Sequence, residues 1–162
     1  MDLNNFLNWR ALTFSLIKHL TSRIFPMVEW ITPEELAQWL NEPIKPQPLL
    51  LDARTEAEYA VSHLKHAERI EPDNPKLAAF AGVSKDMPIV VYCSVGYRSA
   101  GVAERFAQAG FSRVYNLEGS IFQWANQGRP IFKDANPTRL VHPYDLLWGR
   151  LLKSRYRQNK CL

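Results

Sequence analysis

PIVVYCSVGYRS, residues 88–99, is the stretch that decides the fold. Its first half is short, apolar and rich in β-branched residues, which is typical of a buried strand. Cys93 follows directly, and beyond Arg98 apolar residues recur at helical spacing until Gly110. In open α/β sheets the chemistry lies at the carboxyl ends of the strands. The sequence therefore places Cys93 on a tight loop between a strand and the N-terminus of a helix.

This loop predicts a reactive thiol. If the backbone curls around the sulfur, its N–H groups point inward and the helix behind them adds the positive end of its dipole. Gly96 supplies backbone freedom and Arg98 a nearby positive charge. A thiol with an ordinary pKa of about 8.5 should then lose its proton near neutral pH. The alternative is a buried structural cysteine, because free cysteine is among the most buried residue types.

Three ordered motifs resemble those of the rhodanese family of sulfurtransferases. The loop CSVGYR, residues 93–98, is similar to the six-residue active-site loop of that family. Upstream, LLLDARTEAEYAVSHLKHAERI (residues 49–70) resembles the first signature, and downstream VYNLEGSIFQW (residues 114–124) resembles the last. Ser62, His66 and Ser120 stand where the family has glycine, which affects the shape of turns but removes no chemical group.

The resemblance implies an α/β, rhodanese-like fold with a central, roughly five-stranded parallel sheet and helices on both faces. It implies that Cys93 is the catalytic nucleophile. The rest of the loop is then expected to bind substrate: Ser94, Val95, Gly96, Tyr97, Arg98 and Ser99. Asp52, Arg54 and His63 come from the first signature, and we expect them to support the site structurally. The resemblance implies no metal and no organic cofactor.

The implied reaction is sulfur transfer in two half-reactions. Cys93 takes a sulfane sulfur from a donor such as thiosulfate or a persulfide, and a thiol or cyanide acceptor then removes it from the Cys93 persulfide. Two alternatives are weighed. A cysteine-dependent phosphatase or arsenate reductase uses a loop with one more residue between the cysteine and the arginine. A module that only docks a partner has no need of the cysteine, glycine and arginine together.

Other elements follow from periodicity and caps. Strands are predicted over residues 28–31, 49–51, 67–70 and 113–117. Thr32 and Thr55 are each followed three residues later by a glutamate, Glu35 and Glu58, which is the pattern of a capping box at the start of a helix. Short helices alternating with strands predict right-handed crossovers and a parallel sheet.

Positive charge is concentrated at the ends of the chain. Of the net charge of +4, residues 1–27 contribute +2 and residues 137–162 contribute +5, which leaves −3 between them. We expect an amphipathic helical extension over residues 1–27, the rhodanese-like domain over 28–136 and a basic tail over 137–162. A second amphipathic helix is predicted over residues 143–157.

The first helix, predicted over residues 3–25, has three interpretations: a helix packed on the domain, an interfacial membrane helix or an organellar transit peptide. Arg10, Lys18 and Arg23 interrupt it, which argues against a membrane span. The basic ends suit peripheral docking on a membrane or a protein. No nucleic-acid-binding motif accompanies the charge, so a nucleic-acid partner is not expected.

The two cysteines, Cys93 and Cys161, lie far apart and form no paired framework. This usage favours a reducing compartment. We therefore expect a cytoplasmic protein, peripheral to a membrane if the first helix is interfacial, with organellar import as the alternative.

Overall fold

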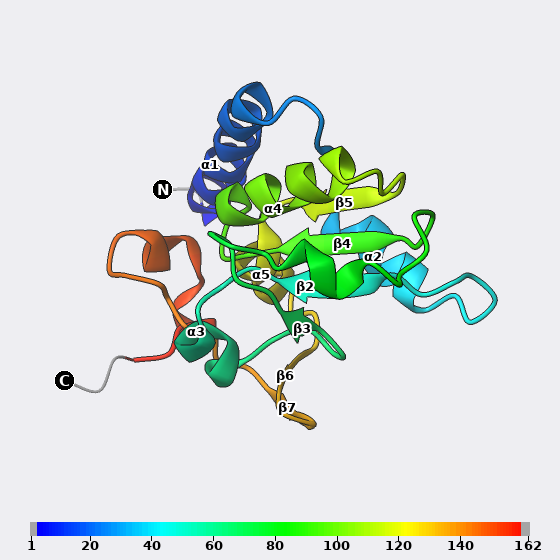
Figure 1. Cartoon of the computed structure of the whole chain (residues 1–162). Helices are drawn as coiled ribbons and strands as arrows, with labels where there is room; N and C mark the ends of the chain where they lie inside the picture. The colour runs from blue at the N-terminus through cyan, green and yellow to red at the C-terminus, as the bar shows by residue number, and fades with distance from the viewer. Residues whose placement is uncertain (1–2, 160–162) are drawn as a thin grey trace.

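A computed structural model describes residues 3–159, with side chains described from residue 9 onward (Figure 1). Its centre is a parallel sheet in the order β1-β5-β4-β2-β3. The five strands are β1 (Glu29–Ile31), β2 (Leu49–Asp52), β3 (Glu68–Arg69), β4 (Ile89–Tyr92) and β5 (Val114–Leu117). Every pairing within this sheet is parallel. The predicted five-stranded α/β architecture is confirmed.

β4 lies in the middle of the sheet and all four of its residues are buried. Because side chains alternate along a strand, Val90 and Tyr92 join the hydrophobic cluster on one face and Ile89 and Val91 join the cluster on the other. β4 is in register with β2, so that Asp52 lies beside Tyr92. The carboxyl ends of the two central strands therefore meet at one edge, directly before Cys93.

Helices cover both faces of the sheet, as predicted. α2 (Pro33–Leu40) and α5 (Ser120–Asn126) add Leu36, Ile121 and Phe122 to the first cluster. α4 (Tyr97–Gln108) adds Val102 and Phe106 to the second. The short helix η1 (Leu77–Phe80) packs against the same second cluster.

Both predicted capping boxes are present. Thr32 caps α2 together with Glu35, and Thr55 caps α3 (Glu56–Val61) together with Glu58. In each case the threonine hydroxyl accepts the N3 amide while the glutamate carboxylate accepts the cap amide. α3 thereby begins at the carboxyl end of β2, on the edge of the sheet that carries Cys93.

The three replacements of glycine take different conformations. His66 and Ser120 adopt left-handed backbone, with φ of 59° and 47°. Ser62 is extended, with φ of −170°. Two of the three positions thus keep the conformation that glycine favours, at a cost in strain that glycine does not carry.

α1 (Leu3–Ile24), drawn in blue in Figure 1, lies beside α4. Phe14 is buried in the first cluster, and the Lys18 ammonium lies 2.7 Å from the Glu118 carboxylate. The helix is therefore packed on the domain, as the first of the three interpretations predicted. A stripe of exposed apolar side chains runs along four successive turns of the helix: Leu12, Leu16, Leu20 and Ile24. Membrane docking by this face stays a prediction, and no described helix has the length and hydropathy to cross a bilayer.

The predicted amphipathic helix over residues 143–157 is wrong. After an antiparallel hairpin of β6 (Ile131–Lys133) and β7 (Asn136–Thr138), the chain continues irregularly with two short 3-10 turns, η2 (Trp148–Leu151) and η3 (Ser154–Tyr156). The Asn126 side chain donates to the Leu151 carbonyl and accepts from the Lys153 amide, both at 2.7 Å. These bonds use backbone groups that a continuous helix would need for its own ladder.

The C-terminal segment is nevertheless part of the packed molecule. Val141, Leu151 and Leu152 are buried in the first cluster, and Val141 forms an isolated bridge with Arg157. The predicted division of the chain at residues 27/28 and 136/137 stays a prediction, and β7 runs across the second of these limits.

Candidate active site

Cys93 begins a four-residue loop that joins β4 to α4. Gly96 caps α4 with φ of 115°, a left-handed backbone conformation that residues with a side chain rarely adopt. The Asn116 side chain donates to the Gly96 carbonyl at 2.8 Å, and the ring of Trp30 lies 3.4 Å from where a Cβ would stand on Gly96. The glycine therefore sets both the turn and the close packing that bring the backbone around the sulfur.

Two donors point at the Cys93 sulfur. The Gly96 N–H lies 3.1 Å from Sγ and the Ser99 hydroxyl lies 3.3 Å from it. Burial of the thiol opposes its ionisation, but the positive charge of Arg98 and the hydrogen bonds from Ser99 and Gly96 outweigh burial and lower the pKa of Cys93 below its ordinary value. The N-terminus of the 12-residue α4 adds its dipole in the same direction. The loop is thus arranged to hold a thiolate.

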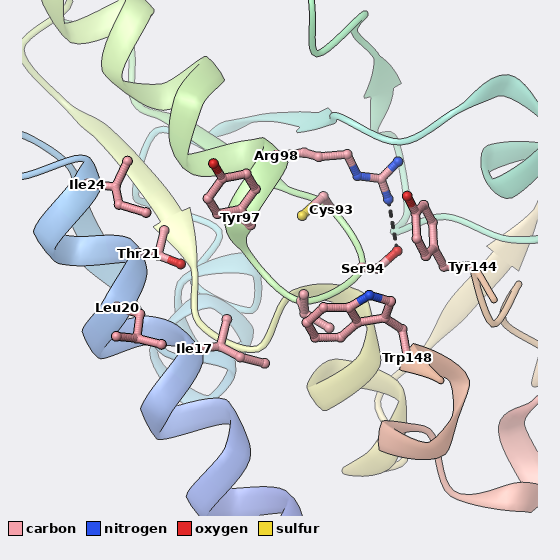
Figure 2. A pocket seen from close by; sticks show the side chains of 11 residues that line it. Ile17, Leu20, Thr21, Ile24, Cys93, Ser94, Tyr97, Arg98, Tyr144 and Trp148 are labelled. Atoms are coloured by element: carbon pink, nitrogen blue, oxygen red, sulfur yellow. Dashed lines mark hydrogen bonds between the residues drawn. The ribbon is translucent and has the colours of Figure 1, made fainter. Parts of the chain in front are cut away.

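Arg98 is held in place by Glu58. Its guanidinium donates two hydrogen bonds to the Glu58 carboxylate, at 2.8 and 2.9 Å, and a third to the Ser94 hydroxyl at 3.0 Å, which Figure 2 marks with a dashed line. The Ser94 hydroxyl in turn donates to Glu58 at 2.9 Å. Arg98 therefore lends its charge to the loop while its own hydrogen bonds are largely taken by this carboxylate.

Glu58 is a site residue that the sequence motifs did not reveal. Burial opposes the ionisation of this carboxyl, but the Arg98 guanidinium and the Thr55 amide hold its pKa at about 2. The capping pattern explains only the contact with Thr55. The sequence did give one indication of its role, since Glu58 lies in the first turn of α3, and α3 begins at the same edge of the sheet as the cysteine loop.

Asp52 and Arg54 form a fully buried ion pair. The Arg54 Nη2 lies 2.6 Å from Asp52 Oδ2, and the same nitrogen donates to the Ser62 carbonyl at 2.6 Å. Neither residue lines the cavity above Cys93. Their contacts hold the turn after β2 and the end of α3, in keeping with the expected supporting role.

His63 also lies away from the cavity. Its ring stacks on Tyr59 at 4.3 Å between centroids, and its backbone pairs with Phe132 of β6. The histidine thus ties the loop before β3 to the hairpin.

Ser120 contributes a contact that a glycine could not make. Its hydroxyl accepts the Cys93 backbone N–H at 3.1 Å and donates to the Leu117 carbonyl at 3.1 Å. The next two amides of α5, those of Ile121 and Phe122, donate to the carbonyls of Cys93 and Ser94. The start of α5 therefore fixes the backbone of the first two loop residues.

A cavity of about 380 Å³ opens above the loop. Cys93, Ser94, Val95, Tyr97 and Arg98 form its floor. One wall is a face of α1 and the opposite wall consists of Tyr144 and Trp148, with the cysteine between them (Figure 2). Cys93 is only 1% exposed, but it shares this cavity with half-exposed side chains such as Leu20 and Tyr144, so a small molecule can reach it from solvent.

Comparison with known proteins places the central part of the chain in one family. The family model "Rhodanese-like domain" matches residues 32–127. A sulfurtransferase from Allochromatium vinosum is 36% identical over 105 residues, which cover 65% of this chain and 95% of that protein.

Two longer relatives match only in part. The probable adenylyltransferase/sulfurtransferase MoeZ of Mycobacterium tuberculosis is 35% identical over 105 residues, covering 62% of this chain and 25% of that protein. The tRNA uridine(34) hydroxylase of Photorhabdus laumondii is 31% identical over 118 residues, covering 70% of this chain and 32% of that protein. The chain thus spans about a third or less of the length of either relative.

Solved structures agree on the fold. A rhodanese-like domain protein from Staphylococcus aureus is similar with a TM-score of 0.53 and 30% identity, covering 60% of this chain and 91% of that chain. The polysulfide-sulfur transferase homodimer of Wolinella succinogenes gives a TM-score of 0.56 at 22% identity, covering 73% of this chain and 88% of that chain. At this lower identity the likeness is one of fold alone. The residues that form the cavity walls lie outside the matched range 32–127.

Proposed function

The chain belongs to the rhodanese-like domain family, and from this premise we propose that it is a sulfurtransferase that carries a sulfane sulfur on Cys93. The donor is a compound such as thiosulfate or a persulfide, and the acceptor is a thiol or cyanide. One observation carries the proposal: the Cys93 sulfur lies on the floor of an open cavity and receives hydrogen bonds from the Gly96 amide and the Ser99 hydroxyl. These donors stabilise an anionic sulfur at this position.

In the first half-reaction, the Cys93 thiolate attacks the outer sulfur of the donor. A new S–S bond forms to Sγ while the donor's own bond to that sulfur breaks, and the electron pair leaves with sulfite or with a thiolate. In the second half-reaction, the acceptor attacks the outer sulfur of the Cys93 persulfide. The electron pair of the broken S–S bond then returns to Sγ, where Gly96 and Ser99 stabilise it.

The two alternative functions are less well supported. A cysteine-dependent phosphatase or arsenate reductase uses a loop with one more residue between the cysteine and the arginine, whereas four residues separate Cys93 from Arg98. A module that only docks a partner would gain nothing from two donors aimed at a buried sulfur. The loop length and the donors aimed at the Cys93 sulfur therefore support sulfur transfer.

The proposal is tested by mass spectrometry of the intact protein after exposure to sulfane-sulfur donors. We expect a gain of about 32 Da, the mass of one sulfur, on the Cys93 peptide, and loss of that mass on addition of a thiol or cyanide. Cys161→Ser is the matched control because it removes the other cysteine of the chain and should load normally. Loading that persists in Cys93→Ser, or that is confined to Cys161, would contradict the proposal.

A further inference from the structure

The walls of the cavity are almost wholly apolar. Ile17, Leu20 and Ile24 of α1 line one side, and Tyr144 and Trp148 line the other. Thr21 is the polar residue among the wall positions described. Five large apolar side chains thus surround the route to Cys93, and four of them remain more than a third exposed: Leu20, Ile24, Tyr144 and Trp148.

No uncompensated cation faces this space among the described residues that line it. Arg98 is the one charged residue in that lining, and its guanidinium is paired with the Glu58 carboxylate at 2.8 Å. The guanidinium also donates to the Ser94 hydroxyl at 3.0 Å, and its carbon lies 5.0 Å from the centroid of the Tyr144 ring. A small inorganic dianion entering the cavity would lose water without gaining an unpaired positive charge in return.

The size of the cavity also exceeds what a small inorganic anion needs. A volume of about 380 Å³ lies within the range of pockets that bind organic molecules. At about 25 cal/mol per Å² of apolar surface removed from water, an apolar group resting against these walls would add to the binding of its ligand.

We propose that the sulfur donor of this protein is an organic persulfide, R–S–SH, with an aliphatic or aromatic body that rests between α1 and the Tyr144–Trp148 wall. This inference depends on the proposed function and narrows it to a substrate class. The Cys93 thiolate attacks the terminal sulfur of R–S–SH. A bond forms between Sγ and that sulfur, the S–S bond of the donor breaks, and its electron pair leaves on R–S⁻, so that Cys93 carries S–SH and no external oxidant or reductant is consumed.

The wall residues lie outside the range that matches the family, while the floor lies within it. The selectivity is therefore a property of the segments that flank the matched domain. Leu20 and Ile24 are placed to provide it because they face the cavity and are not needed to build the sheet.

The test probes the binding of the organic body with two thiosulfonates, methanethiosulfonate and benzenethiosulfonate, which transfer the same terminal sulfur and leave as sulfinates. Their rates of loading sulfur onto Cys93 are compared. For each protein we take the ratio of the benzenethiosulfonate rate to the methanethiosulfonate rate. Comparing this ratio between a variant and the unaltered protein cancels the intrinsic reactivity of each donor. We expect Leu20→Asn combined with Ile24→Asn to lower this ratio by about fivefold or more through the loss of apolar contact. Thiosulfate should load the unaltered protein more slowly than benzenethiosulfonate.

Leu12→Asn is the matched control. Leu12 lies on the same exposed face of α1, two turns before Leu20, but does not line the cavity. Its ratio should equal that of the unaltered protein. A ratio that is the same in all three proteins, with sulfur loading intact, overturns this inference and leaves the proposed function standing. Failure of every donor to load Cys93 overturns both.

Discussion

The floor of the cavity is polar and hydrogen-bonded, whereas its walls are apolar and partly exposed. The floor is held by hydrogen bonds from residues beneath it: Glu58 bonds to Arg98 and Ser94, and Ser120 bonds to the Cys93 backbone. On the walls, apolar side chains such as Leu20 and Trp148 stand partly exposed. The floor lies within the family match and the walls lie outside it. We therefore expect the matched domain to determine the chemistry at Cys93, and the flanking segments to determine which sulfur donors bind in the cavity.

The largest effect on stability is expected where the support beneath the floor is broken. Asp52→Ala leaves the Arg54 guanidinium fully buried without its counter-charge, and should cost about 3–5 kcal/mol in the free energy of unfolding. Glu71→Ala removes the partner of an exposed pair with Arg69 and should change that free energy by less than about 1 kcal/mol. Urea denaturation of both variants measures the difference, and equal costs would contradict the structural role of the buried pair.

The floor was largely predictable from sequence, and the walls were not. The motif around Cys93 carries its own strand, turn and helix start, so local pattern was enough to place the sulfur at the carboxyl end of β4. The pairing of Arg98 with Glu58 joins residues forty positions apart, and it depends on where α3 packs. A local sequence pattern cannot predict a contact between residues so far apart in the chain.

The segment that contains Tyr144 and Trp148 shows why hydrophobic periodicity gave a wrong prediction. Apolar residues at helical spacing predicted a helix over residues 143–157, but the segment is irregular. Leu151 and Leu152 are buried in the core, whereas Leu146 and Leu147 are exposed. The Asn126 side chain stabilises this irregular course through hydrogen bonds with the backbone of Leu151 and Lys153. Tertiary contacts thus override a pattern that is amphipathic in isolation.

Acid should weaken the floor before it affects the walls. The pKa of Glu58 is held at about 2 in the folded protein, below the ordinary value of 4.5. The unfolded chain therefore binds more protons through this group, so its contribution to stability is present above about pH 4.5 and is lost as pH falls toward 2. Glu58→Gln keeps a residue suited to the capping box but removes the charge. Its stability should fall less steeply across this window, and an unchanged slope would contradict the assignment.

A smaller difference is expected between the two left-handed positions that stand where the family has glycine. His66→Gly relieves backbone strain at an exposed residue and should raise the free energy of unfolding by up to about 1 kcal/mol. Ser120→Gly relieves similar strain but leaves the buried Cys93 amide without its acceptor, which costs about 1–3 kcal/mol. Thermal melting of the two variants should therefore separate them, with only His66→Gly gaining stability. A gain in both would show that the Ser120 hydroxyl contributes nothing.

The ionisation of Cys93 is tested most directly by the pH dependence of its alkylation by iodoacetamide, measured in Cys161→Ser protein so that one thiol reacts. We expect the rate to rise with an apparent pKa below the value of about 8.5 for an ordinary thiol, and Ser99→Ala to move this pKa upward by removing a donor to the sulfur. An apparent pKa at or above that of an ordinary thiol would contradict the claim that this loop holds a thiolate.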